Sequence, residues 1–257
     1  MLNTFENVVI VLAIVAGSVA FLWILQRIWP LEQRRQHNDL IGWQVTVVGT
    51  TYAVILGFML YTVWTNFEIA EGNAEAEANS LVSLARSAKG LPDAPGRQIL
   101  DLSRAYVDIM LTNEWPAMNR GTFSPESTRS IQQLWTAVTK TEVHTAAEQT
   151  SLDHTFTELY EMTNHRRLRE LEAIASLPGI LWAVLIAGAV VTIVSACLFG
   201  SIEFKLHLIQ VIMLAMLLSL VLVAIADINR PFQGSVHVSP AGFERARQAL
   251  ADLARQR

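Results

Sequence analysis

The sequence predicts an all-α integral membrane protein that has four transmembrane helices and a helical insert between the second and the third of them. Apolar residues make up 52% of its 257 residues and charged residues only 16%, whereas a soluble domain carries about 25% charged residues. The mean hydropathy is +0.34. Four apolar runs reach the length of about 20 residues that a helix needs to cross the hydrocarbon core. A long polar segment with a helical period separates the second run from the third.

The four apolar runs define the predicted spans. They cover, in order, residues 8–29, 43–67, 180–202 and 206–226. Because lipid offers no partners for backbone N–H and C=O groups, each run is expected to be helical. Tryptophans recur near the ends of the runs, where an indole prefers the headgroup level: Trp23, Trp29, Trp43, Trp64 and Trp182. The chain then divides into residues 1–67 with the first two spans, an extramembrane domain at 68–176, the last two spans at 177–226 and a tail at 227–257.

The segment at 68–176 is expected to be a bundle of four or five helices. It holds 16 of the 23 acidic and 10 of the 19 basic residues, so its net charge is −6. Apolar residues recur throughout it at helical spacing. Breaks are predicted at 90–96 and at 116–125, where Ser124 before Pro125 is typical of a helix start. The first helix of the insert follows the second span with no breaker except Gly72, so the two are expected to be continuous.

The tail is expected to end in an amphipathic helix that begins near Pro240. Its apolar face consists of Phe243, Ala246, Leu250 and Leu253. Docking of this face on the chain's own insert or on a neighbouring subunit is favoured over binding in the headgroup plane. A membrane-surface helix usually shows bulkier apolar residues and a denser basic face.

The distribution of arginine predicts the orientation in the membrane. Arg27, Arg34 and Arg35 lie around the short connection after the first span, whereas only Glu6 precedes that span. By the positive-inside tendency this connection is cytoplasmic, which places both termini and the insert outside the cytoplasm. The opposite orientation is favoured by the arginines that flank the last two spans: Arg166, Arg167, Arg169 and Arg230.

No catalytic, metal or cofactor site is predicted. The six histidines are scattered, and the sequence has no phosphate-binding glycine loop, nucleophile elbow or haem motif. The single cysteine, Cys197, lies inside an apolar run and is expected to be a buried hydrophobic residue. A net charge of −4 gives no reason to expect a nucleic-acid partner. We therefore expect no enzyme, and the expected partners are the lipid bilayer, inorganic ions and further copies of the chain.

The second span has a face of small residues at spacings of four and three: Gly42, Thr46, Gly49, Ala53 and Gly57. Small faces let helices approach closely in lipid. Packing within the chain is the favoured interpretation. The alternative is that this helix packs around an oligomer axis and presents another face to a pore. The pore-lining or packing candidates of the span are Gln44, Gly49, Tyr52, Gly57, Thr62 and Asn66.

Two sets of charged residues flank the spans. Glu68, Glu71 and Glu75 share a helix face directly after the second span. On a single chain they form a solvated face, whereas around an oligomer axis they would form acidic rings, a vestibule that concentrates cations. Asp227 and Arg230 lie three residues apart at the end of the fourth span. We interpret them as a structural ion pair at the membrane end, in preference to a gate or an ion site.

Several short residue strings occur together in a characteristic order and spacing. They are His37-Asn38-Asp39, Gly42, Gly49, Tyr52-Ala53-Val54, Leu56-Gly57-Phe58 and Trp64, then Glu77, Asn79, Leu81, Leu84, Arg86 and Leu91-Pro92, then Glu114-Trp115-Pro116 and Met118, and finally Arg167-Leu168, Leu177-Pro178, Leu181-Trp182, Arg230-Pro231-Phe232, Gly234 and Val238-Ser239-Pro240. With them the chain resembles the bestrophin-like domain family of uncharacterised bacterial four-span membrane proteins. The resemblance implies a four-span helical fold and kinship with bestrophins, which are homopentameric anion channels that hold their large domain in the cytosol.

The leading hypothesis is a homo-oligomeric, bestrophin-like ion channel of the bacterial inner membrane. In it the second span faces the axis and the acidic helix after it forms the vestibule. Kinship favours anions and the acidic vestibule favours cations, so the selectivity stays open. The alternative is a membrane-anchored sensor or scaffold whose helical insert binds a ligand or a partner protein.

Overall fold

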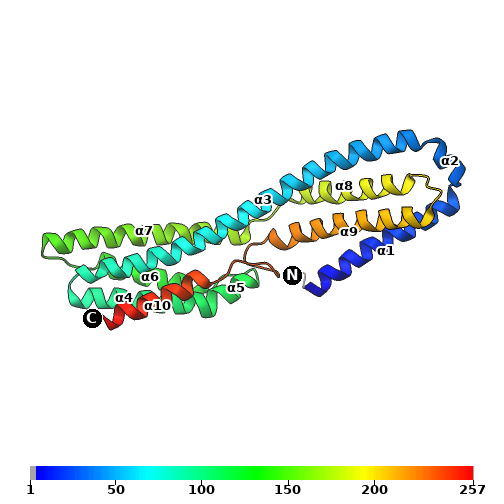
Figure 1. Cartoon of the computed structure of the whole chain (residues 1–257). Coiled ribbons are helices and arrows are strands. Elements are labelled where there is room, and N and C mark those ends of the chain that lie inside the picture. The colour runs from blue at the N-terminus through cyan, green and yellow to red at the C-terminus, as the bar shows by residue number, and fades with distance from the viewer. Residues whose placement is uncertain (1–3, 257) are drawn as a thin grey trace. The chain divides into compact units, whose positions relative to one another are not determined.

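The computed structural model describes residues 4–256, and the regular structure among them is entirely helical, without strands (Figure 1). The all-α prediction is confirmed. The described chain forms two compact units. The membrane unit consists of Met1–Thr65 and Ser176–Asn229, and the insert unit consists of Asn66–Ala175 and Arg230–Arg257.

The membrane unit contains α1 (Thr4–Ile28), α2 (Leu31–Gln36), α8 (Gly179–Leu198), α9 (Phe204–Ile228) and the first part of α3 (Asn38–Ser87). The helices α1, α3, α8 and α9 are long and apolar enough to cross a membrane, as the four apolar runs predict. α1 packs along α9 and against α8. The core of the unit is apolar and includes Leu22, Tyr52, Leu185, Val211 and Ile225.

α3 is a single helix of 50 residues that begins in the membrane unit and ends in the insert unit. Its second part is rich in Ala, Glu and Leu, which favour the helix, and the whole of α3 contains no proline. Gly72 does not interrupt it. The predicted continuity between the second span and the first insert helix is therefore confirmed.

The third span is shorter than predicted, because α8 ends at Leu198 and not at residue 202. A Cβ atom at Gly200 would lie only 2.8 Å from the backbone nitrogen of Arg35. The loop after α8 can therefore pass this close to α2 only with glycine at this position. Asn38 closes the contact: its amide nitrogen donates to Gly200 O at 2.9 Å, and its oxygen accepts from Gly200 N at 2.8 Å.

Two of the arginines that predict the orientation have structural roles. Arg34 is 1% exposed, and its Nη1 donates to Cys197 O at 3.4 Å. A cation at this place stabilises the negative C-terminal end of α8. The guanidinium of Arg27 lies over the ring of Trp23, 4.1 Å from its centroid. Two of the arginines around this connection thus have a role in the fold, independent of the orientation. The orientation itself stays a prediction.

The insert unit is a helical bundle. Besides the second part of α3 it contains η1 (Ala88–Gly90), α4 (Asp93–Ile109), the π-helical segment η2 (Met110–Glu114), α5 (Trp115–Asn119), α6 (Pro125–Thr139), α7 (Ala146–Ile174) and α10 (Ala241–Arg255). α4 packs against α6 and α10, and α6 packs against α7. The predicted apolar faces form the core, and Leu81, Leu84, Ile99, Leu134 and Leu159 are completely buried. The prediction of four or five insert helices is confirmed.

The predicted break at 116–125 is wrong in its first half. The chain stays helical through η2 and α5 to Asn119, and the turn lies at 120–124, with Gly121 at a φ of 76°. Pro116 lies in the first turn of α5, directly after the π-helical turn η2, and a π turn is a place where a continuous helix can accommodate an interrupted hydrogen-bond ladder. Ser124 caps α6 as predicted, since its hydroxyl accepts from Glu126 N at 3.2 Å.

The tail helix α10 docks on the insert of its own chain. Its four predicted apolar residues, Phe243, Ala246, Leu250 and Leu253, are all buried. The Trp115 ring lies 5.5 Å from the Phe243 ring and 5.7 Å from the Phe232 ring, centroid to centroid, and its Nε1 donates to Val238 O at 3.1 Å. The favoured interpretation of this amphipathic helix is confirmed.

Candidate functional site

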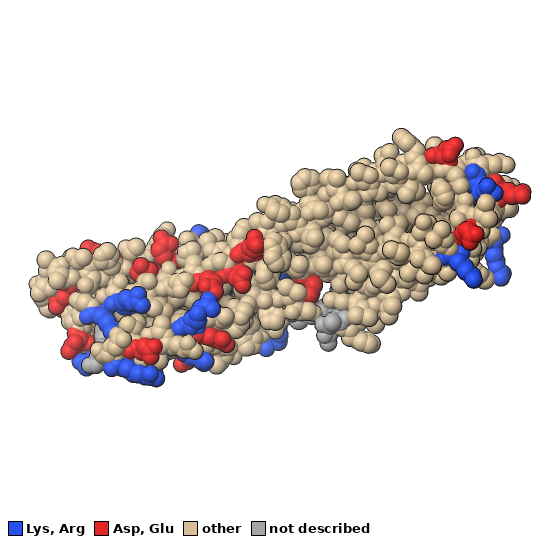
Figure 2. Space-filling view, viewed as in Figure 1, with Lys and Arg blue, Asp and Glu red and all other residues tan. Residues whose placement is uncertain are grey.

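The membrane part of α3 presents a large uncharged surface. No charged residue occurs at 43–67, and the large exposed side chains there are Trp43, Val47, Val54, Phe58, Tyr61 and Trp64. On the face seen in Figure 2 the membrane unit is almost free of charge along its helices, whereas Lys, Arg, Asp and Glu are spread over the insert unit. An exposed apolar face of this size is a contact surface for lipid or for another protein chain.

The six pore-lining or packing candidates lie on different sides of α3. Gln44, Gly57, Thr62 and Asn66 are exposed, Gly49 is half-buried and Tyr52 is buried. The exposed ones are available to a pore, to lipid or to a neighbouring copy.

Tyr52 packs within the chain. Its hydroxyl donates to Leu185 O of α8 at 2.6 Å, and the side chain is 3% exposed. A Cβ atom at Gly188 would overlap the Tyr52 ring. Gly188 therefore lets the aromatic ring of α3 lie directly against the backbone of α8.

No described part of the chain packs closely against the small face of α3 at Gly49 and Gly57. No described atom lies within 4 Å of a Cβ built at either glycine, and at Gly42 only the Phe199 ring comes within that range, at 3.9 Å. Gly49 and Gly57 therefore have room for close approach by another helix, and the role of the small face stays a prediction. The residues that pack α3 inside the unit, such as Tyr52 and Leu56, lie beside the small face.

The three acidic vestibule candidates of α3 differ in their surroundings. Glu68 and Glu71 are exposed, whereas Glu75 is half-buried. Arg245 of α10 forms a hydrogen-bonded ion pair with Glu75. The tail thus neutralises one of the three carboxylates, which the sequence alone does not indicate.

At the predicted ion pair of the membrane end, Asp227 lies in the last turn of α9 and Arg230 follows it at the start of the tail. Arg230 Nη1 donates to Gln233 Oε1 at 3.2 Å. The pair between Asp227 and Arg230 stays a prediction. Among residues 4–256 no group of three or more His, Cys, Asp or Glu side chains is placed to hold a metal ion.

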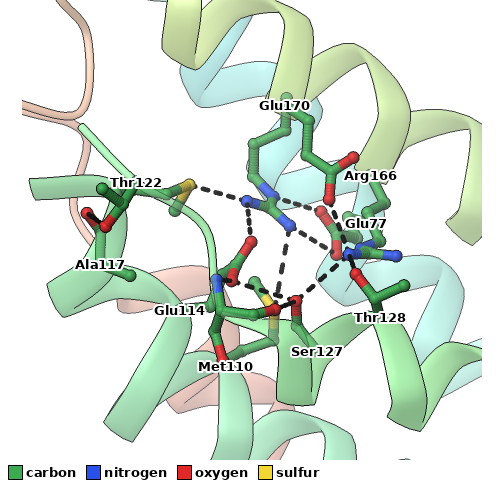
Figure 3. Close-up of polar contacts among 12 residues, drawn as sticks. Glu77, Met110, Glu114, Ala117, Thr122, Ser127, Thr128, Arg166 and Glu170 are labelled. Atoms are coloured by element: carbon green, nitrogen blue, oxygen red, sulfur yellow. Dashed lines mark hydrogen bonds and ion pairs between the residues drawn. The ribbon is translucent and has the colours of Figure 1, made fainter.

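The insert unit also contains a buried ionic cluster that the sequence did not predict (Figure 3). Arg169 of α7 and Glu77 of α3 are both 0% exposed. Arg169 Nε donates to Glu77 Oε2 at 2.6 Å, and its Nη2 donates to Oε1 at 3.4 Å. The Tyr106 hydroxyl donates to Glu77 Oε1 at 2.5 Å. The cluster joins α3, α4 and α7.

Glu114, at the end of η2, extends this cluster to α6. Its Oε2 accepts from Ser124 N at 2.7 Å and from Ser127 Oγ at 3.0 Å. Its Oε1 lies 3.7 Å from Arg169 Nη1 and is buried without a hydrogen bond among the described residues. Arg166 Nη2 donates to Ser127 Oγ at 3.2 Å and pairs with Glu170 Oε1 at 2.7 Å.

The buried groups of the cluster stabilise one another's protonation states. Burial acts to lower the pKa of Arg169, but the charge and hydrogen bonds of Glu77 outweigh it, so the pKa is raised and the guanidinium stays charged. Burial and the neighbouring Glu77 raise the pKa of Tyr106 well above its ordinary value, so the phenol remains a donor. With both partners fully buried, the pair positions α3 against α7 and offers no surface for chemistry.

One sequence signal could have revealed this cluster. Glu77 lies on the same helix face as Ala70, Ala74, Ala78 and Leu81, all of which are buried. A charge on an apolar helix face must find a partner, because an unpaired buried charge is very costly. The partner itself, Arg169, is 92 residues away, and no local pattern indicates it.

A groove lies between α4 and α6 in the insert unit. Its volume is about 890 Å³, and its lining includes Gln98, Leu102, Arg129, Gln133 and Lys140. The lining thus combines amide side chains and apolar residues with charges of both signs, those of Arg129, Lys140 and Glu142. It is a candidate surface for a small polar ligand.

Comparisons with known proteins address the whole chain. The sequence model of the Bestrophin-like domain matches residues 12–243. No curated protein matches the sequence. A bacterial bestrophin homologue from Klebsiella pneumoniae, solved by Zn-SAD phasing, is similar with a TM-score of 0.70 at 14% identity, over 97% of this chain and 99% of that one.

Two mutant structures of a bacterial bestrophin homologue from Klebsiella pneumoniae are similar to the same degree. Both have a TM-score of 0.71 at 14% identity. The first comparison covers 97% of this chain and 99% of that chain, and the second covers 96% of each. At this identity the likeness establishes a common fold.

Proposed function

Because the chain belongs to the Bestrophin-like domain family, we propose that it forms a homo-oligomeric ion channel of the bacterial inner membrane in which α3 faces the axis. The observation that carries the proposal is the membrane part of α3. It is uncharged over 43–67 and has open space next to Gly49 and Gly57, where an added Cβ would meet no described atom within 4 Å. Copies of such a helix can approach one another closely around an axis.

The chemistry along α3 supports a path for ions. The exposed side chains change from apolar at Val54 and Phe58 to polar at Thr62 and Asn66 and then to acidic at Glu71. A hydrophobic constriction followed by charged rings is a combination that channels use for gating and selectivity. The exposed carboxylates favour cations and family kinship favours anions, so selectivity is the quantity to measure.

Ion flux tests the proposal. The purified full chain is reconstituted in liposomes, and the flux of K⁺ and Cl⁻ is measured against empty vesicles. We expect a conductance above background. Its absence under every voltage, pH and calcium condition would defeat the proposal.

A pair of tryptophan substitutions tests the role of α3. Gly57→Trp fills the open face of α3, and Ile186→Trp adds the same side chain to α8, where Ile186 is 55% exposed. If α3 encloses the path, Gly57→Trp reduces the flux and Ile186→Trp leaves it unchanged. Equal effects of the two substitutions would argue that α3 faces lipid.

The alternative function, a membrane-anchored sensor or scaffold, is favoured by one observation, the groove between α4 and α6. Here the membrane helices only hold the insert in place. Measurements on the same vesicles distinguish the two functions. A sensor gives no ion flux, and a substitution in the groove, such as Gln133→Ala, changes only the binding of the ligand or partner.

A further inference from the structure

We propose that Trp43 of a neighbouring copy inserts its indole into a pocket of the membrane unit between α3, α8 and α9. The inference rests on the homo-oligomer of the proposed function and names one contact that holds its subunits together. The occupant of the pocket is thus a second copy of this chain.

The pocket has the size and the walls for an aromatic side chain. Its volume is about 330 Å³, and its lining includes Gly42, Val45, Phe199, His207, Gln210 and Leu214. Most of the wall is apolar, and Gly42 contributes no side chain to it. Two polar groups, His207 and Gln210, stand in this apolar surface. An amphipathic ring with one polar edge suits such a lining.

His207 is one of the two polar side chains that line the pocket. The side chain is 4% exposed, and its Nε2 lies 3.0 Å from Ala196 O. A carbonyl oxygen can only accept, so Nε2 carries the hydrogen in this contact. The side-chain oxygen of Gln210, which also lines the pocket, can accept a hydrogen bond.

Trp43 has the complementary donor at the matching depth. Its indole N–H is a donor only, and the side chain is 66% exposed, so it does not fill the pocket of its own chain. Trp43 directly follows Gly42 of the pocket wall. Rotation about an axis normal to the bilayer preserves depth, so in a cyclic oligomer Trp43 of one copy lies at the level of its neighbour's pocket. Successive residues of a helix point about 100° apart, so the Trp43 side chain and the pocket wall at Gly42 face different sides of α3. In a ring of copies each subunit needs two such different faces, one for each neighbour.

Cross-linking between differently tagged chains tests the contact. Both chains carry Cys197→Ala, which removes the only native thiol. One chain carries Trp43→Cys and the other carries Gln210→Cys, and membranes containing both are treated with a short bis-maleimide. We expect a product that contains both tags. Because each chain holds a single cysteine, that product forms only between copies.

The control places the second cysteine at Ile209, which is also exposed on α9 but points about 100° away from Gln210. We expect several-fold less product with Ile209→Cys than with Gln210→Cys. Equal yields, or a product that joins Trp43→Cys mainly to itself, would overturn the inference, because the indole would then lie at the axis or in the headgroup layer.

Assembly gives a second measurement. Trp43→Ala should weaken association about thirtyfold, as for a buried interface tryptophan, and Trp43→Phe should weaken it less, since the ring remains. Trp23→Ala removes another exposed tryptophan and should leave assembly unchanged. If the unmodified chain is a monomer, the proposed function fails. If it is an oligomer and both Trp43 variants assemble normally, only this inference fails.

Discussion

Arg169 of α7 donates to Glu77 of α3 at 2.6 Å, and both side chains are completely buried. The pair fixes the insert part of α3 against the helix that leads back to the third span. The position of the insert part of α3 therefore depends on the charge of Arg169, which lies 92 residues after Glu77 in the sequence.

Loss of one partner of this pair should be strongly destabilising. We expect Glu77→Gln to lower the free energy of unfolding by about 3–5 kcal/mol, since it removes the carboxylate nearest to the buried Arg169 charge and leaves that charge only Glu114 Oε1, at 3.7 Å. Thermal or denaturant unfolding of the solubilised chain, followed by tryptophan fluorescence, measures the change. Glu71→Gln, at an exposed position of the same helix, should stay within about 0.5 kcal/mol. If the two variants are equally stable, the pair does not position α3.

Trp115 should control the attachment of the tail. It contacts Phe232 and Phe243 and donates to Val238 O. Trp115→Ala is expected to cost about 3–5 kcal/mol by loss of this buried ring and to speed amide hydrogen exchange throughout α10. Phe123→Ala, which removes a 40% exposed ring from the same unit, serves as the control and should leave exchange in α10 unaltered.

Gly188 should not tolerate a side chain. A methyl group there would overlap the Tyr52 ring, so we expect Gly188→Ala to lower the unfolding free energy of the solubilised chain by about 1–3 kcal/mol. Gly179→Ala meets open space on the same helix and should be neutral or slightly stabilising. A stable Gly188→Ala variant would mean that α3 and α8 are not packed through Tyr52.

The stability of the insert should depend on the protonation of Glu172. Burial raises the pKa of this carboxyl, partly offset by its hydrogen bond from Asn73 and by the charge of Arg169, and its Oε2 is buried without a hydrogen bond among the described residues. A raised pKa in the folded state means that this group favours folding below its unfolded pKa and that the contribution is lost as the pH rises through the folded pKa.

Glu172→Gln should therefore raise the melting temperature at pH 8 more than at pH 4 and flatten the pH dependence between them. Melting curves of both proteins across this range give the answer. Glu71→Gln is again the matched exposed substitution, and a slope unchanged by Glu172→Gln would show that Glu172 does not contribute to it.

The acidic residues after the span should contribute unequally to ion selectivity. Glu71 is exposed, whereas Glu75 is paired with Arg245. In the proposed channel, Glu71→Lys should shift the reversal potential in a salt gradient toward that of anions, and Glu75→Gln should shift it much less, because its charge is already balanced. A larger effect of Glu75→Gln than of Glu71→Lys would show that Arg245 does not balance the charge of Glu75.

The parts of the fold that could be predicted from the sequence are those that depend on signals within single helices. Uninterrupted apolar runs, the Ser124 cap and the apolar stripe from Phe243 to Leu253 are local signals, and the helices that they predict are present. Two helix ends were misplaced. α8 ends early, where Gly200 lies against the distant α2, and the helix continues past Pro116, where the π-helical η2 directly precedes α5.

The candidate site shows the same division. The uncharged, small-faced character of α3 and the acidic residues after it follow from the sequence alone, because helical period and residue size determine which side chains share a face. The tertiary structure decided that Tyr52 packs inside, that Arg245 neutralises Glu75 and that Glu77 meets Arg169. These pairs join residues that are 92 to 170 positions apart. Partners at such separations are brought together by packing of whole helices, which no local period encodes.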